Sequence, residues 1–160
     1  MEPQGNCVLA FSLTPEKIAA ALEHKAPNIT QRINAMKQLQ NAGWKVGLRF
    51  DPLIYDEDYR RHYRELFDQV FHALDVDGIH SVSLGGFRLP RDYFKTMVRL
   101  HPREKLFASP LEEKDGMIGY KTSISAEMLH FCREAVLSHV PASRFFPCEP
   151  IPSEPILETA

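Results

Sequence analysis

The chain has 160 residues, which suggests one domain, and its 44% hydrophobic content is enough to bury a core and excludes global disorder. A formal net charge of −2 provides no global attraction to nucleic acid or to an anionic membrane. No apolar run approaches the roughly 18 residues that a membrane helix needs. The N-terminal segment is too short and too uncharged for a secretory signal. We therefore expect a cytoplasmic protein without a membrane partner.

Apolar runs, helix caps and turn residues divide the chain into alternating elements. The predicted elements, in chain order, are a strand at 7–13, a helix at 15–24, a helix from Asn28 or Thr30 to 42, a strand at 44–50, a helix from Asp56 or Asp58 to 74, a strand at 79–84, a helix at 90–100, a short strand at 105–109, a helix at 125–139 and a last short strand at 145–148. Pro52 is expected to end the second strand because proline cannot donate to a ladder. The segment 110–121 is expected to be irregular, with a turn at Asp115-Gly116.

This β-α-β-α-β-α order predicts an α/β fold with parallel strands and helical crossovers. Composition leaves two closures open, an open doubly wound sheet and half of a (β/α) barrel. In both folds, ligands bind at the C-terminal ends of the strands.

Polar residues and glycines at those strand ends are the candidate site. Ser12 ends the first strand, and Arg49 and Asp51 end the second. Asp51 is suited to accept hydrogen bonds from an amine or a ribose, although it could equally cap a turn or pair with Arg49. At the third strand end, Gly85 and Gly86 allow either close approach of a ligand or another backbone, or a tight turn with positive φ.

A basic segment follows the third strand and begins with Arg88. Arg91, Lys95 and Arg99 recur every four residues on a predicted helix, so they share one face. This stripe is suited to contact phosphates. The alternative is a solvated helix face in a chain that has no excess of basic residues.

The sequence predicts no metal site. The three cysteines, Cys7, Cys132 and Cys148, lack the close spacing of zinc or iron–sulfur ligands. Their odd number and wide separation also argue against a disulfide framework.

Several strings occur together in an order that resembles a known family. FSL at 11–13 is followed by RINA at 32–35, then AGWKVGLRFDP at 42–52, SLGGFR at 83–88 and FFP at 145–147. The chain resembles the C-terminal half of the spore photoproduct lyase group of the radical-SAM superfamily. The resemblance covers about residues 7–148, and the block at 42–52 is its most specific part.

The resemblance implies a partial (β/α) barrel, a half-barrel at 1–148, followed by a Pro-rich tail at 149–160. It also implies DNA photoproduct repair chemistry, in which a [4Fe–4S] cluster cleaves S-adenosylmethionine (AdoMet) and the resulting radical acts on a thymine photoproduct. The family's CxxxCxxC motif lies upstream of these strands. The cluster is therefore not expected in this chain alone, and a missing N-terminal half or a partner chain would hold it.

By position, the resemblance implies cofactor contacts for Ser12, Arg49 and Asp51, with substrate contacts as the alternative for Arg49 and Asp51. It implies substrate contacts for Gly85, Gly86 and Arg88. Catalytic residues stay unassigned. The expected partner is DNA or another nucleic-acid-type substrate. The family's DNA-entering hairpin corresponds to 112–120 here, whose acidic tip opposes phosphate. The alternative function is a non-catalytic half-barrel that serves as a binding or interaction module.

Overall fold

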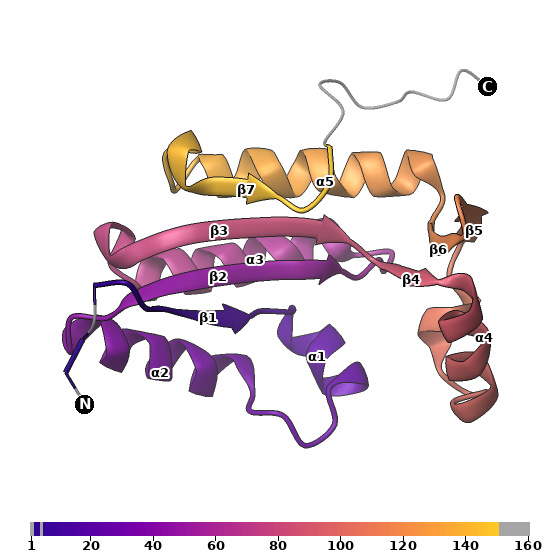
Figure 1. Cartoon of the computed structure of the whole chain (residues 1–160), viewed down its shortest axis with the longest axis horizontal. Helices are drawn as coiled ribbons and strands as arrows, with labels where there is room; N and C mark the ends of the chain where they lie inside the picture. The colour runs from indigo at the N-terminus through magenta and orange to yellow at the C-terminus, as the bar shows by residue number, and fades with distance from the viewer. Residues whose placement is uncertain (1, 4, 151–160) are drawn as a thin grey trace.

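The computed structural model describes residues 2–3 and 5–150, and it places the alternating elements in one main sheet (Figure 1). The elements are β1 Val8–Ser12, α1 Glu16–Leu22, α2 Ile29–Asn41, β2 Lys45–Leu53, α3 Tyr59–Ala73, β3 Ile79–Gly86, β4 Arg88–Pro90, α4 Arg91–Leu100, β5 Leu111–Lys114, β6 Met117–Tyr120, α5 Thr122–Leu137 and β7 Phe145–Pro147. Short 3-10 turns cover Val76–Gly78, Lys105–Ala108 and Ala142–Arg144.

The main sheet is parallel and has the strand order β1-β2-β3-β7. The α2 helix packs against β2, and α5 packs against β3. Figure 1 shows α3 and α5 passing behind the strands, while no described helix crosses in front of them. The predicted α/β class with parallel strands and helical crossovers is thus confirmed, and one face of the sheet is left open.

The covered face holds the core because strand side chains alternate between the two faces. Val46, Leu48 and Phe50 point to this face and are fully buried. Phe50 meets Phe67 of α3 edge-on, with ring centroids 5.0 Å apart. The α3 helix presents its apolar residues at the three- and four-residue spacing of one helical stripe, and all of them are buried.

A second, smaller sheet joins β4, β6 and β5 in antiparallel order. Its β5–β6 hairpin corrects the expectation of an irregular segment at 110–121. The turn at Asp115 and Gly116 has φ angles of 52° and 75°. These are the left-handed values that a tight two-residue hairpin turn needs, and Asp and Gly tolerate them.

Two further local predictions are wrong, and one is not tested. The β2 strand continues to Leu53, because its ladder with β3 is interrupted between Phe50 and Leu53 and Pro52 needs no N–H there. The segment 105–109 is a 3-10 turn instead of a strand, with the Glu104 side chain accepting from the backbone N–H of Leu106. The tail from residue 151 lies outside the described residues.

Candidate functional site

Small and polar side chains line the open face of the main sheet. Strand register places the following residues on this face, opposite the core: Ala10 and Ser12 of β1, Gly47, Arg49 and Asp51 of β2, Ser81, Ser83 and Gly85 of β3, and Phe146 of β7. Phe146 is the large apolar side chain among them, and it is 53% exposed. Four of the predicted site residues therefore share one surface.

Arg49 lies in the middle of this face, beside Ser12 in the sheet register. Its Nη1 donates to the carbonyl oxygen of Leu48 and to Ser81 Oγ, both at 3.2 Å. Both distances are at the long end of the normal hydrogen-bond range, so these contacts hold the guanidinium weakly. Arg49 is therefore available to an anionic group that approaches the open face.

Asp51 forms a cluster with Ser83 and Cys148. Ser83 Oγ donates to Asp51 Oδ2 at 2.9 Å, and Cys148 Sγ lies 3.4 Å from the same oxygen. Partial burial is the main cause that raises the pKa of the Cys148 thiol, and the hydrogen bond of the thiol to Asp51 raises it further. The thiol therefore stays protonated at neutral pH. The alternative pairing of Asp51 with Arg49 is not found among the described residues.

Gly85 and Gly86 allow another segment of the chain to pack closely against β3, and they do not form a turn. Neither has a positive φ, and both lie inside β3, which corrects their placement after the strand end. A Cβ on Gly85 would lie 3.0 Å from the Cβ of Cys148 and 3.3 Å from that of Asp51. Gly86 donates its N–H to Glu149 Oε1 at 2.6 Å. The group that approaches these glycines is the chain's own segment after β7.

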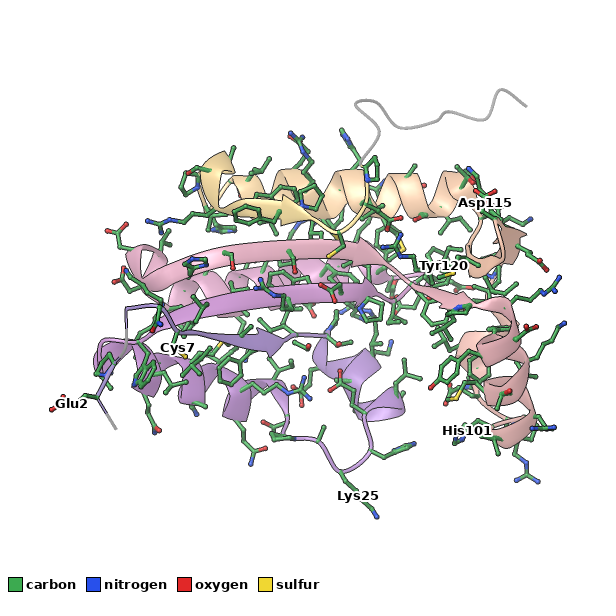
Figure 2. The ribbon with its side chains drawn as sticks, viewed as in Figure 1. Glu2, Cys7, Lys25, His101, Asp115 and Tyr120 are labelled. Carbon is green, nitrogen blue, oxygen red and sulfur yellow. The ribbon has the colours of Figure 1, made fainter. Side chains whose placement is uncertain are left out.

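Arg88 lies apart from the other candidates, on β4 of the small sheet. It donates through Nη2 to the carbonyl oxygen of Cys148 at 3.2 Å, and its Nη1 is 3.8 Å from Glu149 Oε2. Arg88 and Glu149 line a cavity of about 470 Å³ between the hairpin and the start of α5. Figure 2 shows Asp115 at the hairpin tip and Tyr120 nearer the strand ends.

A further cavity contains none of the predicted site residues. It measures about 840 Å³ and lies between α1, the loop after β2 and the connection from α4 to β5. Its charged lining residues are Lys17, Asp56, Glu57, Asp58, Arg103, Glu104 and Lys105. They come from the loop after β2, from α1 and from the segment after α4, so a search confined to the last residues of each strand missed them.

The described residues do not fit an iron–sulfur cluster. No group of three or more His, Cys, Asp or Glu in the described ranges could hold a metal ion. Cys132 is buried in the core, whereas Cys148 is exposed beside Asp51 and Cys7 precedes β1. No catalytic step is therefore derived through a cluster in this chain.

A parallel sheet with helices on one face and polar residues on the other is a segment of a partial (β/α) barrel. The chain belongs to the spore photoproduct lyase family, whose model matches residues 1–115. A comparison with curated proteins finds no match.

Solved structures of the family share the fold. A spore photoproduct lyase variant with bound AdoMet and dinucleoside spore photoproduct superposes with a TM-score of 0.73 at 17% identity, and the match covers 88% of this chain and 43% of that chain. The lyase complexed with dinucleoside spore photoproduct gives 0.69 at 16% identity, with the same coverage. This chain thus spans less than half of the length of these structures. Among the described helices, none combines the length and apolarity that a bilayer crossing requires.

Proposed function

We propose that this chain supplies the C-terminal half of a radical-SAM protein of the spore photoproduct lyase type. In this proposal the open sheet face receives AdoMet, and the strand ends and the hairpin face a lesion in DNA. The [4Fe–4S] cluster belongs to an N-terminal half or a partner chain. The cofactors supply the radical chemistry, and this chain binds and orients them.

One observation carries the proposal: a parallel sheet with a polar uncovered face. Parallel sheets are normally covered by apolar layers on both sides. Here the uncovered side presents Ser12, Arg49 and Asp51 near the ends of their strands. In barrel folds this inner surface near the C-terminal strand ends is where ligands bind, and membership of the family supports AdoMet as the ligand.

The side chains match the functional groups of AdoMet. Its carboxylate is a partner for the Arg49 guanidinium, which can form two parallel hydrogen bonds to such a group. Its amine or ribose hydroxyls can donate to the Asp51 carboxylate. Ser12 is exposed on the neighbouring strand, where its hydroxyl can donate or accept. On the substrate side, Gly85, Gly86 and Arg88 lie where the sheet meets the hairpin.

The edge of β1 is the proposed contact with the N-terminal half. Among the described strands, β1 pairs with β2 on one side only. An edge strand offers a row of backbone N–H and C=O groups to another strand. A strand from the other half would continue the sheet there and leave the polar face lining the barrel interior.

Isothermal titration with AdoMet tests this proposal, on the chain alone and mixed with the N-terminal half of a family enzyme. We expect saturable heat, weakened by at least about tenfold in Asp51→Asn, which corresponds to the loss of one charge-assisted hydrogen bond. Asp68→Asn, an exposed site on the outer side of α3, is the matched control and keeps full affinity. Absence of saturable heat in both samples would refute the AdoMet site.

The same β1 edge favours a second function, a non-catalytic half-barrel that associates with another chain. This function predicts a molar mass that rises with concentration in analytical ultracentrifugation, without any AdoMet heat. A strictly monomeric, folded chain at high concentration would count against it.

A further inference from the structure

The α4 helix carries cations along its outer side. No residue of α4 is buried. Arg91, Lys95 and Arg99 follow one another at four-residue spacing, which places them about 6 Å apart along the axis. Such a row extends over about 12 Å and complements a chain of charges better than one compact anion. In Figure 2, His101 marks the C-terminal end of this helix.

The ion pairs of this row are weak competitors for an external anion. Arg91 is 3.2 Å from Glu113, and Lys95 is 3.7 Å from Asp92. All four side chains are exposed, and such pairs contribute only about 0–1 kcal/mol each. Among the described residues, no carboxylate lies within 4.0 Å of the Arg99 guanidinium. Phosphates can therefore replace these partners at low cost.

After α4 the chain carries two further cations, Arg103 and Lys105, which line the cavity of about 840 Å³. Two of the four acidic lining residues of this cavity have partners within the chain. Asp56 Oδ2 is 2.8 Å from His62 Nδ1. Asp58 lies 3.0 Å from Arg61, whose hydrogen bond is the main cause that lowers the pKa of Asp58.

The cationic residues that line the cavity form no ion pairs within the described part of the chain. Lys17, Arg103 and Lys105 have no carboxylate within 4.0 Å in the described part of the chain. These three cations are therefore available to a phosphate, while the lining as a whole holds four carboxylates.

The cavity also offers apolar surface of the kind that a nucleobase needs. Its apolar lining residues are Ile18, Ala21, Leu22, Ile54, Tyr55 and Leu106. The volume of about 840 Å³ falls within the range of small-molecule and cofactor sites. On α4, the Tyr93 side chain is 53% exposed, and exposed aromatic rings stack on bases.

We propose that α4 and the connection to β5 form a phosphate-binding track for a single strand of nucleic acid, and that the cavity receives one nucleoside of this strand. The proposal rests on the proposed function, which supplies DNA as the strand. It adds a contact surface that lies outside the open sheet face, on α4 and the segment that follows it.

Fluorescence anisotropy with a labelled thymidine oligonucleotide of about 12 nucleotides tests the track, since this length lies within known site sizes. The variant Arg99→Glu/Arg103→Glu is expected to bind at least about tenfold more weakly. Its slope of log affinity against log salt should be shallower by about 1.4, because each single-strand phosphate contact contributes about 0.7. The control Lys37→Glu/Arg64→Glu changes the charge equally on α2 and α3 and should bind as the wild type does.

A second pair of variants tests the cavity. Ala21→Trp fills the cavity from α1 and should weaken binding several-fold without changing the salt slope, because no cation is lost. Ala20→Trp is the control. It places the same ring on α1 in a different cavity, which Glu65 and Leu66 of α3 also line, and it should have no effect. Equal affinity of both Trp variants would overturn the nucleoside site.

The outcomes separate this inference from the proposed function. If the wild type binds DNA, and Arg99→Glu/Arg103→Glu binds with the same affinity as the control Lys37→Glu/Arg64→Glu, the track is refuted while the AdoMet site is unaffected. If the wild type does not bind DNA, or if polyglutamate competes as well as the oligonucleotide, the inference also fails. AdoMet titration decides the proposed function independently in each case. Circular dichroism verifies the fold of every variant, and Arg99→Gln/Arg103→Gln replaces the reversed pair if that pair unfolds.

Discussion

Replacing Gly85 by Ala tests how closely the segment after β7 approaches the sheet beside the candidate site. The new Cβ would lie 3.0 Å from the Cβ of Cys148, which is tighter than ordinary van der Waals contact, so the neighbouring segment must move by a few tenths of an ångström. Overpacking of this kind typically costs about 1–3 kcal/mol. We therefore expect Gly85→Ala to lower the free energy of unfolding by about this amount.

The same substitution in two Cys148 backgrounds isolates the clash. Cys148→Ala keeps the Cβ that Gly85→Ala would meet, so the cost of the substitution should stay the same. Cys148→Gly removes that Cβ, so the cost should fall by about half or more, since only the contact of 3.3 Å with the Asp51 Cβ is left.

Urea unfolding followed by the fluorescence of Trp44 measures these differences, because Trp44 is the single tryptophan and is buried. The two backgrounds are compared at equal m-values, so that a changed unfolded state is not mistaken for a changed clash. An equal cost of Gly85→Ala in the Ala and Gly backgrounds would refute the reasoning, because the strain would then come from elsewhere.

Three further predictions concern a helix cap, the hairpin and the thiol. Asn28→Ala removes an acceptor 2.8 Å from a backbone N–H of the first turn of α2, and should cost about 1 kcal/mol in urea unfolding. Tyr120→Phe leaves the backbone N–H of Tyr55, now 2.9 Å from the hydroxyl, without its partner, and should cost about 1–3 kcal/mol. Asp51→Asn removes a negative neighbour of Cys148, which lowers the thiol pKa, so alkylation of Cys148 at pH 8 should become faster, as mass spectrometry of the labelled peptide can show. An unchanged or slower rate would contradict this last prediction.

The main sheet could be predicted from the sequence because its strands and helices are locally specified. The apolar stripe of α3 predicts a helix, and the apolar runs of β2 and β3 predict strands, without any information from distant residues. Asn28, one of two proposed caps, forms a capping box with Gln31. Side-chain alternation along β2 also places Arg49 and Asp51 on the face opposite the core without any knowledge of the partners.

Contacts between distant segments could not be predicted in this way. The turn at 115–116 was recognisable, but β5 is a charged tetrapeptide, and β6 gains its second partner from β4, more than twenty residues earlier. Asp51 meets Ser83 only because β2 and β3 pair in one particular register. The large cavity combines three loops, and no single stretch of sequence carries its pattern.

The polarity of the open face determines which surface of this chain is suited to association with another chain. A module that docked through its sheet face would bury that face, and burying Arg49 and Asp51 without matched partners would cost several kcal/mol. Docking through the β1 edge uses backbone hydrogen bonds and leaves the face free. Among the described residues of this face, Phe146 is the one large apolar side chain that is exposed. The arrangement thus favours association through the strand edge, with the polar face kept for a small ligand whose charges match Arg49 and Asp51.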